Sequence, residues 1–487
     1  MTIGEIKLWG VVVGVLTFSF LFWWLSRRRP AGFKEWLKNP ELFNQLCADP
    51  EAIQLGIARA REWPDADLRK ELHRYVWKGS DLPGTPEKHV LLALGERVRP
   101  WVLELLGDPA LQARLTSLSK NKLFKQSPLE RACGLLSGPA AAAAIPRLIP
   151  FQSHPNEEIR KIAALALGSI GTPEAVAPVR TALRDEEPYV RSYALIGLNR
   201  AVAAGELHAA CLPALFEDLK KLITAGNNVG AAADLLLLAD SAAATDFLRR
   251  SEALQPDAPA LEEVLACLAK KQIGVPRGPL LTLIEALERR EMKHPLPYAL
   301  GSALHLLGQQ RERDDREFLH ARTTHPEKRI AEGAAEGLVA WVGLAGFSQR
   351  LWKTLAEGKL ADLPVPQQRY LAVVMLDAEV NNGGFSQYFF NSAGDHWRDA
   401  QVGLDMMGFQ ERAEMLRDAT NRFGPAGPSA DRTERQEQLA RLARKNENEF
   451  DDLDDRYYQC QESVEVLSCD YVVKHHELFQ PIGPVDP

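Results

Sequence analysis

A short pattern of apolar and small residues recurs in the middle of the chain, and it restricts the fold more than any other feature. Residues 159–171 and 190–202 match at a spacing of 31 residues. Residues at i, i+4 and i+8 lie along one face of an α-helix, so each copy has one face to bury. We expect the alanine at the middle position to let a neighbouring helix approach closely. The matched pairs are Ile159 and Val190, Ala163 and Ala194, and Leu167 and Leu198.

The residues after the first copy have the composition of a joint between helices. Gly171 can end the first helix, and Thr172 can cap the next one. Pro173 suits the first position of that helix, and Glu174 lies near its positive end. A further copy at 325–339 shares a His-Pro start with residues 154–168. Helix pairs that cannot bury their apolar faces alone are expected to stack. The predicted fold class is therefore all-α, with an α-solenoid in the middle.

These residues resemble HEAT-type repeats, the short variety first noted in bilin-lyase proteins. The resemblance covers residues 130–205 and extends more weakly through 206–345. It implies a solenoid that offers a concave face to another macromolecule. A plain spacer or scaffold role is an equal alternative to a specific binding face. Some relatives are lyases, so a lyase-type enzyme is kept as a further alternative.

Near the amino terminus, residues 8–26 contain no charged side chain. At about 1.5 Å per helical residue they would reach roughly 28 Å, close to the hydrocarbon core of a bilayer. Three arginines follow at 27–29, so the positive-inside rule predicts a single-pass inner-membrane protein with its N-terminus outside and its bulk in the cytoplasm. A cleaved signal peptide is the alternative, but it would have its basic cluster before the apolar stretch.

Negative charge gathers at the carboxy-terminal end. The chain carries a net charge of −7, whereas residues 360–487 hold 23 acidic and 12 basic side chains. An acidic surface repels nucleic acid and attracts basic proteins, so we expect protein partners and no direct nucleic-acid contact. The six cysteines form no CxxC pair and no zinc-type spacing with histidine, so no metal or cofactor is expected.

A glycine, amide and aromatic motif opens the last quarter of the chain. An amphipathic helix after Pro366 is predicted to end at Gly383 and Gly384, because glycine adopts the positive φ of a helix end. Aromatic residues at i, i+3 and i+4 follow, and two amides share a second helix face. We interpret the motif as structural rather than as a binding site. Its residues are Asn381, Asn382, Gly383, Gly384, Phe385, Gln387, Tyr388, Phe389, Asn391 and Ser392.

This region resembles the bacterial domain-of-unknown-function family that includes a small DNA-mimic protein. Residues 376–397, 431–439 and 450–458 carry the resemblance. It implies an all-helical domain and, as in the namesake, acidic side chains that imitate duplex phosphates. Basic residues interrupt the acidic run, so a solvated helix face is the simpler interpretation. The candidate partner-binding residues are Glu447, Glu449, Asp451, Asp452, Asp454 and Asp455.

Motifs for catalysis are not found in the sequence. It contains no HExxH, no GxSxG and no phosphate-binding loop. His396 beside Asp395 is the best single ionisable candidate, but neighbours at i, i+1 diverge on a helix. We therefore expect a protein that is not an enzyme.

Five segments result from these patterns. They are a transmembrane anchor at 1–30, a helical region open to atypical repeats at 31–129, HEAT-like repeats at 130–345, a linker at 346–363 and a separate acidic helical domain at 364–487. The leading hypothesis is a membrane-anchored scaffold that binds protein partners at the cytoplasmic face. The alternative is regulatory sequestration of a basic DNA-binding protein by the carboxy-terminal domain.

Overall fold

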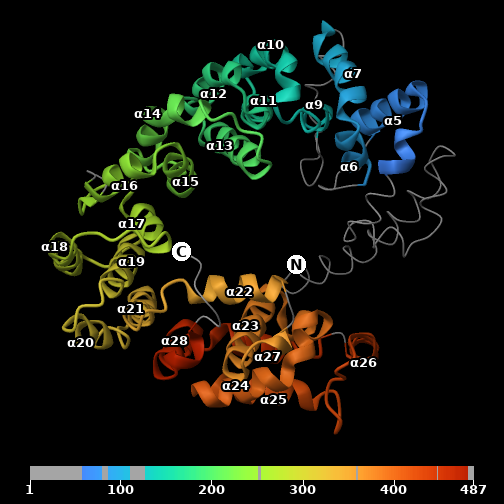
Figure 1. Cartoon of the computed structure of the whole chain (residues 1–487). Helices are drawn as coiled ribbons and strands as arrows, with labels where there is room; N and C mark the ends of the chain where they lie inside the picture. The colour runs from blue at the N-terminus through green and yellow to red at the C-terminus, as the bar shows by residue number, and fades with distance from the viewer. Residues whose placement is uncertain are drawn as a thin grey trace. The chain divides into compact units, whose positions relative to one another are not determined.

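A computed structural model describes residues 57–78, 86–109, 127–250, 254–357, 360–446 and 448–480 (Figure 1). Every regular element over these ranges is a helix, which confirms the all-α class. The chain divides into two compact units, residues 1–219 and 220–487, and each is described by itself.

The predicted inner-membrane location with a transmembrane anchor has to be corrected. Within the described ranges, none of the helices is both long and apolar enough to cross a bilayer. The longest helix, α23 (Val365–Phe390), carries charged residues and is broken by a glycine kink. Residues 8–26, on which the prediction was based, lie outside the described residues.

The first unit consists of short helices joined by tight turns. In chain order they are α5 (Asp65–Lys78), α6 (Pro86–Ala93), α7 (Gly95–Gly107), α9 (Pro128–Cys133), η1 (Pro139–Ala144), α10 (Ile145–Leu148), η2 (Ile149–Ser153), α11 (Glu157–Ile170), η3 (Pro173–Ala175), α12 (Val176–Leu183) and α13 (Pro188–Ala203). Helix α14 (Cys211–Thr224) follows and reaches into the second unit. The two matched sequence copies form α11 and α13, which pack against each other.

The turns between helices follow the sequence signals. Gly171 ends α11 with a φ of 69°, and Pro173 takes the first position of η3. Thr172 stands at the cap position, but its side chain makes no capping hydrogen bond. The His-Pro start has a definite role in two copies, because the ring Nδ1 of His154 and of His325 accepts a backbone N–H two residues on, each at 3.0 Å.

Glycines, more than the predicted alanines, set the closest approach of paired helices. A Cβ built on Gly168 would lie 2.7 Å from the carbonyl oxygen of Ala194. In the second unit, a Cβ on Gly308 would lie 1.9 Å from the carbonyl oxygen of Gly337. Any larger residue would force the backbones apart. Ala163 and Ala194 are fully buried in the same α11–α13 contact.

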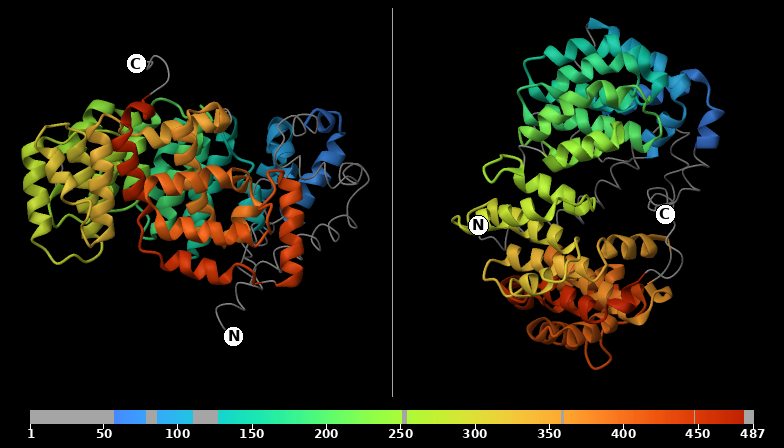
Figure 2. Two further views of the ribbon diagram at one scale, coloured as in Figure 1. Left: turned by 90° about the horizontal axis from the view of Figure 1, so that it is seen from below. Right: turned by 60° about the vertical axis from the view of Figure 1, so that its left-hand side comes forward.

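The second unit continues the helix pairs and then changes character. Its paired helices are α15 (Val229–Ala239), α16 (Ser241–Arg250), α17 (Leu261–Lys270), α18 (Arg277–Glu288), α19 (Leu296–Gly308), α20 (Asp315–His320) and α21 (Lys328–Trp341). Helices α15, α17, α19 and α21 pack side by side in that order (Figure 2). The rest of the unit is α22 (Phe347–Glu357), η5 (Leu360–Asp362), α23, η6 (Ser392–His396), α24 (Trp397–Met407), α25 (Gln410–Asn421), α26 (Arg432–Lys445), α27 (Asp451–Gln459), α28 (Val464–Lys474) and η7 (His476–Phe479).

One hydrophobic core joins the last helix pair, α19 and α21, to the carboxy-terminal helices; we call this pair the last repeat. It begins with Ala335 and Val339 on α21, includes Phe347 and Leu351 on α22, and continues through α23 to η7. Phe347 packs against Tyr370 with ring centroids 5.2 Å apart. Helix α22 therefore occupies the segment 346–363 in which we expected a linker; the segment boundaries themselves stay predictions.

Candidate functional site

A sharp corner in α23 shapes the carboxy-terminal domain. Gly384 has a φ of 75° and a ψ of −178°, a backbone conformation that is essentially restricted to glycine. The corner frees the backbone N–H of Phe385, which donates to Asp454 Oδ1 at 2.8 Å. An acidic residue of α27 therefore caps the second half of α23.

The two amides of the motif meet on one acid, as their i, i+4 spacing suggests. Gln387 Nε2 and Asn391 Nδ2 donate to the same oxygen, Oε2 of Glu379, at 2.7 and 2.8 Å. Because Glu379 precedes the corner, these bonds tie both halves of α23 together. Asn381, Asn382 and Ser392 are exposed.

The aromatic face of the motif is packed inside. Phe385 and Phe389 are fully buried and stack with centroids 6.3 Å apart. Tyr457 of α27 meets Phe385 edge-on at 5.6 Å. Tyr388 is also fully buried, and its hydroxyl has no hydrogen-bond partner in the described part of the chain. These contacts are internal to the domain.

Arg435 on α26 is a central residue that the sequence analysis missed. Its side chain is completely buried, and Nε donates to the carbonyl oxygen of Phe389 at 2.7 Å. Further bonds reach the carbonyl oxygens of Asn391 and Ser429 at 3.1 and 2.8 Å. The guanidinium also forms an ion pair with Asp395, so the partner of this carboxylate is Arg435 and not the neighbouring His396.

The acidic stretch is partly used for internal contacts. Arg422 pairs with Asp452 at 2.7 Å, and this hydrogen bond holds the pKa of that carboxyl below its usual range. Asp454 caps Phe385, and Glu449 accepts a hydrogen bond from Asn446 at 3.1 Å. Asp451 and Asp455 are exposed on α27. Glu447 lies outside the described residues.

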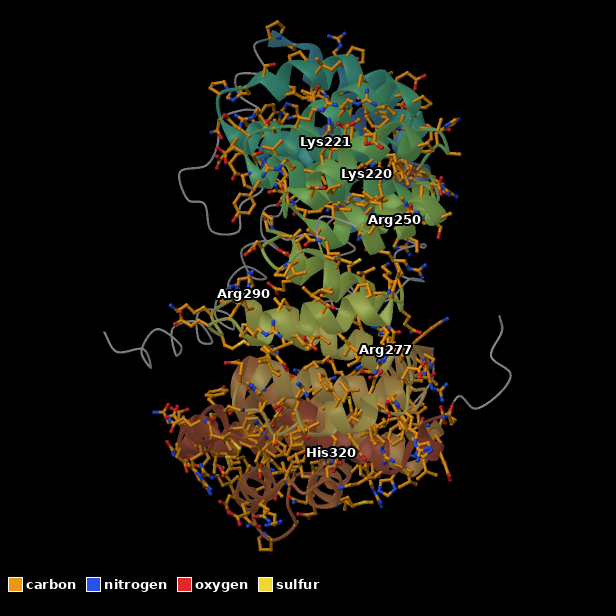
Figure 3. The ribbon with its side chains drawn as sticks, turned by 90° about the vertical axis from the view of Figure 1, so that its left-hand side faces the viewer. Lys220, Lys221, Arg250, Arg277, Arg290 and His320 are labelled. Carbon is orange, nitrogen blue, oxygen red and sulfur yellow. The ribbon has the colours of Figure 1, made fainter. Side chains whose placement is uncertain are left out.

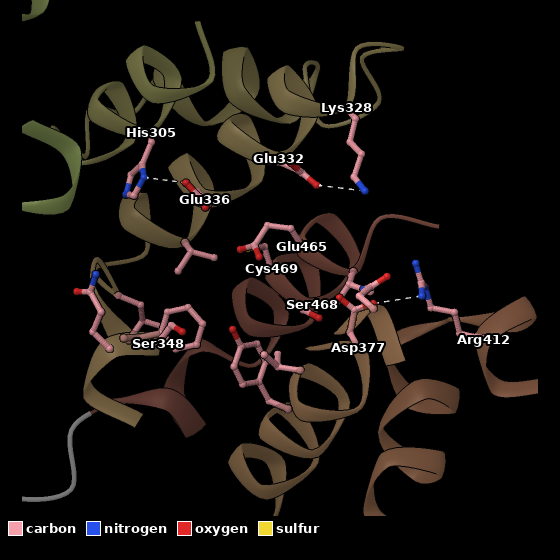
Figure 4. A pocket seen from close by; sticks show the side chains of 18 of the residues that line it. His305, Lys328, Glu332, Glu336, Ser348, Asp377, Arg412, Glu465, Ser468 and Cys469 are labelled. Carbon is pink, nitrogen blue, oxygen red and sulfur yellow. Dashed lines mark hydrogen bonds and ion pairs between the residues drawn. The ribbon is translucent and has the colours of Figure 1, made fainter. Parts of the chain in front are cut away.

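A groove of about 530 Å³ lies in the second unit, where α19 and α21 face α23, α27 and α28 (Figure 4). Two ion pairs and one histidine–carboxylate contact line it. His305 Nδ1 lies 3.0 Å from Glu336, Lys328 lies 3.8 Å from Glu332, and Arg412 lies 3.2 Å from Asp377.

Glu465 on α28 faces into this groove. Burial and then the nearby carboxylates of Glu336 and Glu332 raise the pKa of Glu465 to about 7. The Cys469 thiol, one helical turn on, donates to Glu465 Oε1 at 3.2 Å. Ser463 Oγ, at the start of the same helix, donates to Glu332 Oε1 at 3.2 Å. The groove is therefore rich in carboxyl groups that approach from two directions.

This arrangement suits binding of a cation better than covalent chemistry. Burial raises the pKa of the Cys469 thiol well above its ordinary value, so the reactive thiolate is scarce at neutral pH. Over the described ranges, no group of three or more His, Cys, Asp or Glu side chains is placed to hold a metal ion. A lysine or arginine side chain could instead pair with Glu336 and Glu465.

The sequence analysis did not identify the groove residues, although one signal was present. In the copy at 325–339, Glu332 and Glu336 stand where the copy at 154–168 has Lys161 and Leu165. The i, i+4 spacing places both carboxylates on one helix face. Glu465 offered no such signal, because it meets them only through the packing of α28 on α21.

Comparison with known proteins places two families on this chain. The model of the DMP19-like protein family matches residues 361–476, and the model of HEAT repeats matches residues 129–199. Both agree with the resemblances found in the sequence. A search among curated proteins gave no match.

Proposed function

We propose that this protein is a non-catalytic scaffold that binds a protein partner through its last helical repeat and its DMP19-like domain together. Helical repeats and a DMP19-like domain are both consistent with protein interaction. We infer that one partner contacts both the last repeat and the DMP19-like domain because the two share a hydrophobic core.

That shared core is the observation that carries the proposal. Phe347 and Leu351 on α22 belong to the same apolar cluster as Val339 of α21 and Tyr370 of α23. Parts that share a buried core keep a fixed arrangement, because separating them would expose apolar surface to water. A partner held by the domain would then meet the repeat at a defined distance and angle.

The groove is the surface at which we place the partner. Its walls come from both parts, with Glu336 from the repeat and Glu465 and Asp377 from the domain. A basic side chain of the partner would lie between Glu336 and Glu465. Its charge would compensate the repulsion between these two carboxyl groups.

The test is affinity capture from native lysate with the full chain, followed by binding of each captured protein in purified form. We expect a partner that is retained by the unchanged chain and lost when Glu336→Ala and Glu465→Gln are combined. The matched control is Glu285→Ala, which removes an exposed carboxylate of α18 outside the groove. A partner that binds the Glu336→Ala, Glu465→Gln double variant as tightly as the unchanged chain would contradict the placement at the groove.

Sequestration of a basic DNA-binding protein is the second candidate, and it is favoured by the exposure of Asp451 and Asp455. Two carboxylates on one short helix make a small negative face compared with duplex DNA, which has one charge per roughly 1.7 Å. The test is Asp451→Lys with Asp455→Lys. This pair leaves the internal contacts of Asp452 and Asp454 intact. Mimicry requires salt-sensitive binding of a basic protein that this double variant abolishes, and unchanged binding would refute it.

A further inference from the structure

A second cavity of the second unit lies where the turns between successive helix pairs come together. It measures about 750 Å³ and is formed by the end of α16, the turns after α17, α19 and α21, the start of α22 and the end of η7. This is within the size range of small-molecule and peptide sites. Its polar lining consists of arginine and glutamine side chains, and no acidic residue contributes to it.

Three arginines give this cavity an uncompensated positive charge. Arg311 Nε donates to the carbonyl oxygen of Trp341 at 3.2 Å, and Arg350 Nη1 donates to that of Ala345 at 2.8 Å. These bonds orient the side chains without neutralising them. Across the described part of the chain, no carboxylate forms an ion pair with Arg311, Arg350 or Arg249.

Three arginines on another face of the same unit are each paired with a carboxylate. Figure 3 looks onto the face that carries Arg250, Arg277 and Arg290. Arg277 pairs with Asp315 at 2.6 Å and Arg290 with Asp257 at 2.7 Å, and Arg250 pairs with an acid one turn away on α16. The cavity arginines differ from these three in having no carboxylate partner among the described residues, so they can pair with an external anion.

One amide of the lining, that of Gln309, is held in a fixed orientation. Gln309 lines the cavity, and its Nε2 donates to the carbonyl oxygen of Ala269 at 2.7 Å, which fixes the orientation of the amide. Its Oε1 is buried and receives no hydrogen bond within the described residues. A buried acceptor without a donor costs free energy. A ligand in the cavity cannot reach this oxygen, so the kind of ligand follows from the charge of the arginines.

We propose that this cavity binds an acidic peptide segment, with aspartate or glutamate carboxylates on the arginines. The peptide is that of a protein partner, and in this respect the inference rests on the proposed function. Arginine binds carboxylates through paired parallel hydrogen bonds, so a segment with several carboxylates engages more than one of the three.

The experiment measures fluorescence anisotropy of a labelled synthetic peptide of alternating aspartate and glutamate, with both ends blocked, on the full chain. We expect binding that Arg311→Gln with Arg350→Gln weakens at least about tenfold, because hydrogen bonds to charged groups are the strong ones. Arg250→Gln, on the outer face, is the matched control and should leave the affinity unchanged. Thermal midpoints of the variants verify that each remains folded.

Two further arms separate the peptide from other anions. A peptide of the same length made of asparagine and glutamine should bind at least about tenfold more weakly. Inorganic pyrophosphate should displace the labelled peptide only when it is present in excess over the peptide. Equal binding by the arginine double variant would overturn the proposal, and so would displacement of the peptide by pyrophosphate at equal or lower concentration. Either failure leaves the scaffold function standing, because the groove test uses other residues.

Discussion

At the scale of single residues, the corner at Gly384 decides whether α23 can fold back onto α27. Its φ of 75° disfavours every L side chain, and a Cβ there would lie 2.1 Å from Asp454 Oδ2. Gly384→Ala therefore combines backbone strain with loss of the Asp454 cap. We expect it to lower the free energy of unfolding by about 3 kcal/mol, measured by urea denaturation.

The matched control is Gly230→Ala on α15. A Cβ there would meet nothing within 4 Å, and the backbone is helical. This substitution should be neutral or stabilise by up to about 1 kcal/mol. If both alanines had the same small effect, the corner would not be under the strain that we assign to it.

The same residues show how far sequence reasoning reaches. The paired glycines predicted a turn, since the requirement for positive φ is local. The acceptor for Phe385 lies 69 residues away, and the partner of the buried Arg435 at Phe389 lies 46 residues away. Nothing in the local pattern distinguishes Asp454 from its exposed neighbour Asp455. Long-range hydrogen bonds of this kind become visible only when the helices are packed.

At the scale of elements, the packing of α28 on α21 brings Glu465 against Glu336, and His305 faces the same groove. The pKa of Glu465 is raised from 4.5 to about 7, so the folded chain holds this proton more tightly than the unfolded chain. The stability that this protonated carboxyl group contributes to the folded chain is fully present below pH 4.5 and is lost as the pH rises through 7.

Glu465→Gln gives a side chain with the shape of protonated glutamate that stays uncharged at all pH values. We expect the variant to exceed the unchanged chain in stability by about 1–3 kcal/mol at pH 8 and to equal it near pH 4.5. Thermal unfolding of both proteins across this range measures the difference, and Glu285→Gln on α18 is the exposed control. A difference that does not change with pH would contradict the shifted titration.

Elements differ in how well the sequence predicts them. Helices α11, α13 and α21 follow from their repeated apolar stripe, because burial on one face imposes the spacing. The role of α22 did not follow, although the helix has apolar residues at Phe347 and Leu351. Two prolines after it suggested a break in the chain. The prolines do interrupt the helices, but the interruption is a tight turn inside one core.

At the scale of the whole molecule, the shared core predicts where the carboxy-terminal part can be separated from the repeats. A fragment that starts at residue 360 agrees with the boundary of the DMP19-like match, yet it lacks α22. Phe347 packs on Phe479 as well as Tyr370, with centroids 5.8 and 5.2 Å apart. Loss of this ring and of Leu351 uncovers apolar surface at both ends of the domain. Burial of two such side chains contributes about 3–5 kcal/mol.

Fragment 345–487 should therefore unfold at a higher urea concentration than fragment 360–487. The urea midpoint of Phe347→Ala in the longer fragment should lie between those two midpoints. Lys353→Ala is the matched control on the same helix, because this side chain is exposed and should contribute little. Equal midpoints for the two fragments would mean that α22 adds nothing to the domain. The scaffold proposal would then lose part of its support, since α22 and α28 are the elements that join α21 and the carboxy-terminal domain into one core.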